Sequence, residues 1–395
     1  MFLVRPKPKE DEALESYIIR LVKANGYSSL GMFLRTIGAL SDSEKPDDVN
    51  SPKALSSINL YHSQISSQRR IEIIKTIAKL ADTAFSEIYD ICLSRSSVNF
   101  SNGRTGLFRK GVVVPRSQLL PLDSVRICPK CIDEALYIRQ IWSFEAYSTC
   151  HIHNVPLIDR CSGCGSPIEI YRELTCMCKV CDMKFSEVIG NKLHESDFLI
   201  SAWLAGQYVE KLPDVSISHR WGLHTFYTDY ISGQESRTEG FINFFTDWPK
   251  NFISKIDQDT EYRLSIGLKP VQESTFQEVF GSLLVDASKL PARNMSENIV
   301  LRAIFSHLYE QTFDKKSPIG SVIMNSLEVS ILLNSSTEQV AALFEQGLLQ
   351  AYRRVSSKSA PSIYTPLFRL ENVMSVWLTS YQSPSSNIRH FTSRW

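Results

Sequence analysis

The sequence predicts a mainly helical protein built around a pair of zinc-binding modules. Eight of its nine cysteines lie between residues 128 and 181, and apolar residues recur at helical spacing on both sides of that segment. Two consecutive helix-capping motifs then follow near the C-terminus. We therefore expect an N-terminal helix-turn-helix-type domain (1–100), a tandem zinc-finger region (101–190) and an all-helical C-terminal domain (191–395), with a winged helix-turn-helix-like unit near 325–370.

Length and composition are those of an ordinary globular protein of several domains. The 395 residues are 43% hydrophobic and 22% charged, too long for one core and too apolar for disorder. No apolar run approaches the roughly 20 residues of a membrane span, and the first residues lack the apolar core of a secretory signal. We expect a cytoplasmic protein that does not bind membranes, whose thiols stay reduced.

The first hundred residues predict short helices joined by tight turns. Asp11 is placed to cap a first helix, and Thr83 is placed to cap a fourth. A third helix is expected over Ser67–Leu80, after a loop over Ser41–Ser57 that is rich in Ser, Asp and Pro. The pattern fits a helix-turn-helix domain and a plain small helical bundle equally well.

The cysteine-rich segment divides into two sets of four potential metal ligands, each made of two closely spaced pairs. The first set is Cys128, Cys131, Cys150 and His153, and the second is Cys161, Cys164, Cys178 and Cys181. Each pair fits a turn that presents two ligands to one tetrahedral Zn²⁺. Four protein ligands leave no open position for substrate, so we predict two structural zinc ions.

Other uses of these cysteines are less compatible with the sequence than zinc. Disulfides would need an oxidising compartment, and thioredoxin-like redox chemistry would need a single Cys-x-x-Cys beside a βαβ pattern, which is absent. Cys176 precedes Cys178 by two residues and is an alternative fourth ligand, although the spacing to Cys181 favours Cys178.

The remainder of the zinc region predicts a small core. A helix is expected over Ile132–Phe144, with Trp142, Phe144 and Tyr147 packing around the first metal site. Phe100–Asp123 is interpreted as a connector that contains one short strand, Val112–Pro115.

The C-terminal part carries the winged helix-turn-helix signal. Ser296 is placed to cap a helix that begins near Ile299, and Asn325-x-x-Glu328 and Ser336-x-x-Gln339 are capping-box patterns for two further helices. The second of these two helices has acidic side chains, Glu338 and Glu345, and no Lys or Arg. A helix that enters the major groove faces phosphates, so these acids favour a protein contact over DNA.

Net charge argues against strong autonomous binding of nucleic acid. The formal charge is only +1, with 43 basic against 42 acidic residues. Basic residues nevertheless concentrate in Ser94–Arg126 and in Ala351–Trp395. Solvated faces are the commoner explanation, and the candidate contacts to nucleic acid or a partner are Arg104, Arg109, Lys110, Arg116, Arg353 and Arg354.

No catalytic motif is recognisable in the sequence. It contains no Gly-rich phosphate loop, no Gly-x-Ser-x-Gly elbow and no His-Glu-x-x-His zinc helix. The prediction is a protein that is not an enzyme.

Several motifs resemble the TniQ family, which includes the TnsD-like proteins that choose targets for bacterial transposons. The family's opening stands here as Glu15-Ser16-Tyr17-Ile18-Ile19-Arg20 and Asn25-Gly26-Tyr27. Its zinc signature stands as Cys128-Pro129-Lys130-Cys131, Trp142, Cys150-His151-Ile152-His153-Asn154-Val155-Pro156-Leu157 and Cys161. Ser201-Ala202-Trp203-Leu204-Ala205-Gly206, His219-Arg220-Trp221-Gly222-Leu223 and the ending Ser393-Arg394-Trp395 look like the short TniQ of type I-F CRISPR-associated transposons.

That resemblance implies a non-catalytic adaptor. Proteins of this class form a head-to-tail homodimer and dock on crRNA-guided Cascade, at the crRNA-processing subunit and the adjacent backbone subunit. They then recruit the AAA+ regulator TnsC and the transposase, and they reach DNA mainly through the complex. The alternative is a TnsD-like protein that reads a fixed attachment site directly, but such proteins have a longer C-terminal region.

Overall fold

The computed structural model describes residues 2–43, 68–100, 105–121, 125–169, 174–187, 194–230, 237–291, 295–314, 317–353 and 361–382. Contacts within the chain divide it into two compact units. Unit 1 holds residues 1–99 and 104–221, and unit 2 holds residues 100–103 and 222–395. The predicted division into three domains stays a prediction, and each unit is described by itself.

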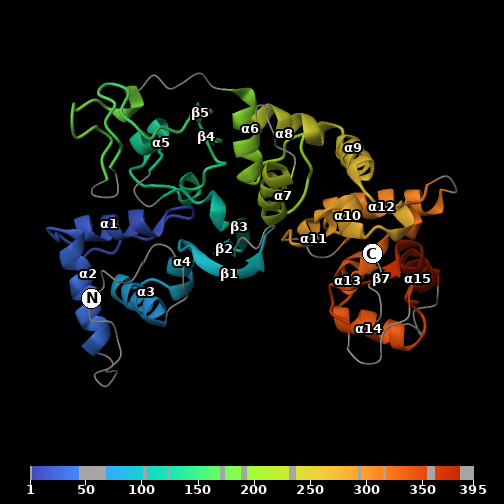
Figure 1. Ribbon diagram of the computed structural model, residues 1–395. Coiled ribbons are helices and arrows are strands. Elements are labelled where there is room, and N and C mark those ends of the chain that lie inside the picture. The colour runs from blue at the N-terminus through green and yellow to red at the C-terminus, as the bar shows by residue number, and fades with distance from the viewer. Residues whose placement is uncertain are drawn as a thin grey trace. The chain divides into compact units, whose positions relative to one another are not determined.

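Unit 1 begins with four helices, as expected. They are α1 (Leu14–Ala24), α2 (Leu30–Ser43), α3 (Gln68–Ala81) and α4 (Phe85–Asp90) (Figure 1). Their apolar faces meet in one core that includes the fully buried Tyr17, Phe33 and Ile77. Most of the loop expected over Ser41–Ser57 lies outside the described residues, and its first three residues belong to α2.

The two predicted N-terminal caps are wrong. The residue before α1 is Ala13 and the residue before α4 is Ala84, and neither helix has a side-chain cap. Asp11 instead forms an ion pair with Arg139, and the Thr83 hydroxyl donates to the Ala81 carbonyl. The Asp11 carboxylate and the Thr83 hydroxyl thus bind other groups instead of the backbone N–H groups at the helix ends.

The segment after α4 folds as a small antiparallel sheet rather than as a connector. Its strands are β1 (Ser94–Asn99), β2 (Thr105–Arg109) and β3 (Val112–Pro115), in that order across the sheet. Arg109 pairs with Val112 across a two-residue turn, Lys110-Gly111, in which both residues have positive φ. This is the geometry that a tight hairpin with the usual right-handed twist requires. The strand Val112–Pro115 is as expected, whereas β1 and β2 are additional.

The zinc region contains little regular structure. It comprises α5 (Pro129–Glu134), the 3-10 turns η3 (Arg116–Gln118), η4 (Gln140–Ser143) and η5 (Phe185–Glu187), and the short antiparallel pair β4 (Thr149–Cys150) and β5 (Val155–Pro156). Helix α6 (Glu195–Leu204) follows, and α7 (Ile217–Tyr230) contains the boundary between the units.

The continuous helix expected over Ile132–Phe144 is wrong. Helix α5 ends at Glu134, because Ala135 is extended and the following residues run beside the segment that precedes α1. There the Ile138 N–H donates to the Ser16 hydroxyl at 3.0 Å, and its carbonyl accepts from the Ala13 N–H at 2.9 Å. These long-range hydrogen bonds replace the helical ones and override the local helical pattern.

Unit 2 is almost entirely helical. It contains α8 (Arg237–Thr246), α9 (Lys250–Ile266), η6 (Val271–Glu273), α10 (Phe276–Phe280), α11 (Leu283–Ser288), α12 (Ile299–Phe313), η7 (Ile319–Ser321), β6 (Ile323–Asn325), α13 (Ser326–Leu332), α14 (Thr337–Glu345), β7 (Pro366–Arg369) and α15 (Leu370–Gln382). The cap of α12 is Asn298, whose side chain accepts from Val300 and Leu301, and not Ser296 as predicted. Asn298 is fully buried, so this helix cap lies inside the core.

The winged helix-turn-helix-like unit is confirmed. Both predicted capping boxes form, at Asn325 for α13 and at Ser336 for α14, and β6 pairs with β7. Ala351 forms a further bridge to Phe368, so the chain returns after α14 as a strand-like wing. Together with the zinc region, this confirms the mainly helical fold class. Among the described residues, no helix is long and apolar enough to cross a membrane.

Candidate metal centres

The first predicted ligand set converges on one point. The ligand atoms of Cys128, Cys131, Cys150 and His153 all lie within 4.8 Å of one another. The Cys131 and Cys150 sulfurs are 3.7 Å apart, and His153 Nδ1 lies 3.2 Å from the Cys131 sulfur and 3.5 Å from that of Cys128. Four ligands at about 2.0–2.3 Å from a tetrahedral ion are separated by roughly 3.3–3.8 Å, so the cluster has the size of a metal site.

Local turns explain how paired ligands reach the same point. Cys128 precedes α5 at its N-cap, Pro129 starts the helix, and the Cys131 N–H points at the Cys128 sulfur at 3.5 Å. In the second pair, the Cys150 carbonyl accepts from the Asn154 N–H at 2.9 Å, and Asn154 has a φ of 52°. Asn tolerates this left-handed conformation better than most residues, which explains its place just after His153.

The second set forms another cluster of four. Its sulfur atoms also lie within 4.8 Å of one another, with 3.6 Å between Cys161 and Cys181 and 3.6 Å between Cys164 and Cys178. The four thiols are free, as are those of the first set. The structure therefore brings Cys178 into the cluster and leaves Cys176 outside it.

The turn at Cys150 recurs twice in the second cluster. The Cys161 carbonyl accepts from the Gly165 N–H at 2.8 Å, and the Cys178 carbonyl accepts from the Asp182 N–H at 2.9 Å. Gly165 and Asp182 have φ values of 71° and 55°. Gly, Asp and Asn are the residues that accept positive φ most readily. The residue four positions after each of these three ligands is therefore of a type that favours the turn.

A carboxylate that was not predicted from the sequence completes the first centre. Glu134 Oε1 lies 2.8 Å from His153 Nε2, the ring nitrogen that faces away from the cluster. A carboxylate in this position fixes the orientation and tautomer of a metal-binding histidine, and it raises the basicity of the ligand nitrogen. The signal was present in the sequence, because Glu134 follows Cys131 by three residues on a short helix, but only the fold reveals its partner.

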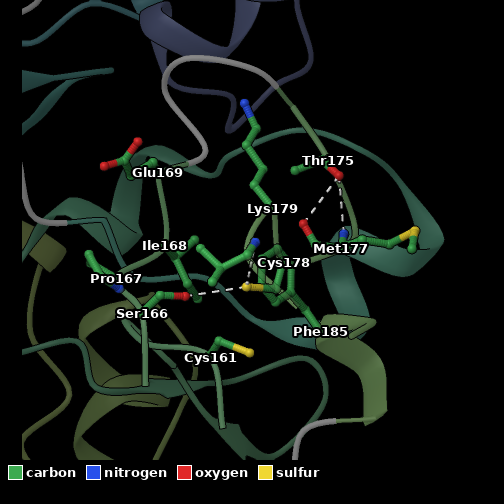
Figure 2. Close-up of a pocket in the computed structure, with 11 residues that line it drawn as sticks. Cys161, Ser166, Pro167, Ile168, Glu169, Thr175, Met177, Cys178, Lys179 and Phe185 are labelled. Carbon is green, nitrogen blue, oxygen red and sulfur yellow. Dashed lines mark hydrogen bonds between the residues drawn. The ribbon is translucent and has the colours of Figure 1, made fainter. Parts of the chain in front are cut away.

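The two centres differ in their surroundings. The three cysteines of the first centre are buried, and the predicted aromatic residues Trp142, Phe144 and Tyr147 are buried in the same unit. In the second centre, Cys164 and Cys181 are exposed. A small cavity of about 150 Å³ lies beside it, lined by Ile168, Met177 and Phe185 among others (Figure 2).

Polar contacts stabilise the second centre from within this cavity. The Ser166 hydroxyl lies 3.3 Å from the Cys178 sulfur (dashed in Figure 2) and 2.9 Å from the Cys164 sulfur. The Val180 N–H points at the Cys178 sulfur at 3.4 Å. Such hydrogen bonds offset the negative charge that thiolate ligands concentrate around a metal ion.

The basic residues proposed as contacts are not one uniform surface. Arg104 and Arg354 lie outside the described residues. Arg109 is half-buried with its Nε donating to Gln140, and the pKa of its guanidinium is lowered because burial disfavours the charge. Lys110 is exposed and paired with Glu10, Arg116 is half-exposed, and Arg353 lies over the Tyr352 ring.

The acidic face of α14 is exposed as predicted. Glu338 and Glu345 are both exposed, with Ala341 between them, while Val340 and Leu343 are buried on the opposite side. The exposed face continues into Leu348, which is 57% exposed. This mixture of acids and apolar atoms is unlike a helix that faces a phosphate backbone.

Comparison with known families assigns the first part of the chain. Residues 3–157 match the family model named TniQ. The match covers the four N-terminal helices, the small sheet and the whole first centre, and it ends before Cys161. No curated protein matches the chain. The resemblance noted in the sequence is thus confirmed for this part of the chain, which carries a TniQ domain in residues 3–157.

Proposed function

We propose that this protein is the target-selection adaptor of a CRISPR-associated transposon. The TniQ domain implies a non-catalytic adaptor associated with transposition. In the proposed reaction a homodimer docks on crRNA-guided Cascade, recruits the AAA+ regulator TnsC, and brings the transposase to DNA beside the guide-matched site. The protein makes no chemical step itself; its role is to hold two partners together.

Zinc is the proposed metal of both clusters. All eight ligand atoms are thiolate sulfurs or imidazole nitrogen, the donors that Zn²⁺ prefers in tetrahedral sites with four protein ligands. A zinc ion in the first centre would be held by Cys128, Cys131, Cys150 and His153. It would supply folding free energy to a region with little regular structure of its own.

The proposal of the CRISPR-associated subtype is based on the resemblance of two stretches, which lie at the contact between α6 and α7. The two stretches that look like that subtype are linked here by one buried side chain, Arg220. Its Nη1 donates to the carbonyls of Trp203 at 2.8 Å and Gln207 at 2.6 Å, and its guanidinium lies over the Trp203 ring. These residues therefore have a structural role here, which is to hold the start of α7 against the end of α6.

The acidic face of α14 is the observation that favours an adaptor over a protein that reads DNA directly. Phosphate groups would be repelled by Glu338 and Glu345, whereas a basic protein surface would be attracted. A TnsD-like direct reader would need the opposite charge on this helix.

A pull-down with charge-reversal variants tests this proposal. Immobilised full-length protein is incubated with crRNA-loaded Cascade, with TnsC, and with both. Glu338→Lys with Glu345→Lys should weaken capture of at least one of these two partners, while the control Glu210→Lys, an exposed acid elsewhere, should not. Unchanged capture of both partners by the double variant, or tighter binding of wild-type protein to a specific duplex than to either partner, would favour the direct reader.

A further inference from the structure

A second feature of unit 1, next to the first ligand cluster through the contact of Arg139 with Cys131, has the properties of an anion-binding site. An open pocket of about 750 Å³ lies where the segment before α1 meets the β2–β3 turn and residues 137–139. Its volume lies in the range of pockets that hold a small ligand or one unit of a polymer rather than a lone ion. The charged side chains of its lining are Lys9, Glu10, Asp11, Arg109, Lys110 and Arg139.

Ion pairs neutralise half of the positive charge in the pocket. Asp11 is paired with Arg139 and accepts a hydrogen bond from the Tyr137 hydroxyl at 3.1 Å. Glu10 is paired with Lys110. Both acids are therefore committed to basic neighbours, and the Glu10–Lys110 pair is exposed, where such pairs contribute little.

The other two cations in the pocket form no ion pair among the described residues. Lys9 Nζ lies 5.0 Å from the centre of the Tyr137 ring, and the Arg109 guanidinium donates a hydrogen bond to the neutral Gln140 amide. With four basic and two acidic side chains in the lining, the pocket carries an excess of two positive charges. A half-buried arginine without a directly paired carboxylate is costly, and an anion that entered the pocket would relieve that cost.

Tyr137 holds these charges in place. The ring is buried, and both Lys9 and the Arg139 guanidinium lie over it, the latter 5.1 Å from the ring centre. Burial raises the pKa of Tyr137 to about 12, so its hydroxyl remains a neutral donor to Asp11. Two cations drawn to one ring keep their side chains near the pocket, which reduces the entropic cost of binding a ligand.

We propose that this pocket binds a phosphate group of a nucleic-acid strand. A phosphodiester has two non-bridging oxygens that share one negative charge and can accept from Lys9 and Arg109 together, and arginine is suited to such bidentate contacts. The half-exposed Arg116, which follows β3, extends the positive charge along the same segment. A polymeric anion uses such an extension, whereas a single carboxylate of a protein partner does not.

Fluorescence anisotropy with the full-length protein tests this proposal. The probes are a short fluorescent single-stranded RNA, a duplex DNA of the same length, and unlabelled inorganic phosphate and polyglutamate as competitors. The pocket variant is Lys9→Gln with Lys110→Gln, and the control is Lys211→Gln with Lys250→Gln, two exposed lysines that do not line the pocket. All four positions are exposed, so the variants are expected to fold.

The pocket variant should bind more weakly than both wild-type and control protein. For RNA, the slope of log K against log salt concentration should fall by roughly 0.7 for each phosphate that is no longer neutralised, and for duplex DNA by roughly 0.9. Comparison of the two probes identifies the kind of strand that supplies the phosphate. Equal affinity and slope in pocket and control variants would overturn the proposal, as would binding to neither nucleic acid. Because Cascade is absent from this assay, the result is independent of the adaptor role.

Discussion

Replacement of Glu134 by Gln tests how the first metal centre is built. Gln keeps the size and an acceptor oxygen but removes the charge that faces His153 Nε2 at 2.8 Å. Loss of a carboxylate behind a metal-binding histidine typically reduces metal affinity about 10- to 100-fold. The Glu134 side chain is 64% exposed, so solvent screens its charge. We therefore expect the lower end of this range, about tenfold or 1.4 kcal/mol.

The assay is a competition titration of the full-length protein. Co²⁺ is used in place of zinc, because three thiolates with one imidazole absorb differently from four thiolates, and the two centres can be followed separately. The matched control is Glu210→Gln, which removes an exposed acid that does not contact either cluster. Glu134→Gln should weaken the first centre and leave the second unchanged. Equal affinity at the first centre in wild-type protein and variant, or equal losses at both centres, would refute the proposed role of Glu134.

Three further predictions concern stability and metal content. Cys131→Ala should remove one metal equivalent and unfold residues around the first centre, seen as fast hydrogen exchange there; full metal content in a folded variant would contradict this. The second centre should lose its metal first to a chelator, because Cys164 and Cys181 are exposed, and Cys164→Ser should abolish that fast phase; a fast phase that persists would show the order to be wrong. Burial raises the pKa of the Glu328 carboxyl to about 7. Between pH 4.5 and 7 this carboxyl therefore ionises in the unfolded protein but stays protonated in the folded protein. As the pH rises through this range, the unfolding free energy falls by up to about 3 kcal/mol. Glu328→Gln keeps an acceptor for the Asn325 N–H and should be more stable than wild-type protein at pH 8 but not at pH 4, measured by urea unfolding; equal stability at both pH values would contradict it.

The ligand sets were accessible from sequence because each pair is a local feature. The two ligands of a Cys-x-x-Cys pair and the residue with positive φ that follows them lie within five positions. Spacing alone therefore indicated which sulfurs could bind the same metal ion. The choice between Cys176 and Cys178 followed from the same spacing. Glu134 was not accessible in this way, because its contact with His153 joins residues 19 positions apart.

Helix ends and short strands were predicted less well, for a related reason. The capping boxes at Asn325 and Ser336 are local and formed as expected. Asp11 was assigned to a cap, but Arg139, which is distant in sequence, provides a stronger charged partner. The interval from Ala135 to Arg139 has helical periodicity, yet its backbone bonds to the segment before α1. Local patterns fail where a long-range partner competes for the same polar group.

The anion pocket illustrates the same limit. Arg109 and Lys110 stand out in the sequence as part of a basic stretch, but nothing in the sequence places Lys9 or Arg139 beside them. Nor does the sequence reveal that Asp11 and Glu10 cancel two of the four charges. The functional consequence depends on this balance, which only the fold determines.

The adaptor role is tested most directly by co-elution of this protein with Cascade. The full-length protein is mixed with crRNA-loaded Cascade and resolved by size-exclusion chromatography with light scattering, and a parallel run contains duplex DNA alone. We predict a complex with Cascade that contains two copies of the chain, and no sequence-specific complex with bare duplex. A stable complex with one duplex sequence, together with no association with Cascade, would contradict the adaptor role and identify a direct reader of DNA.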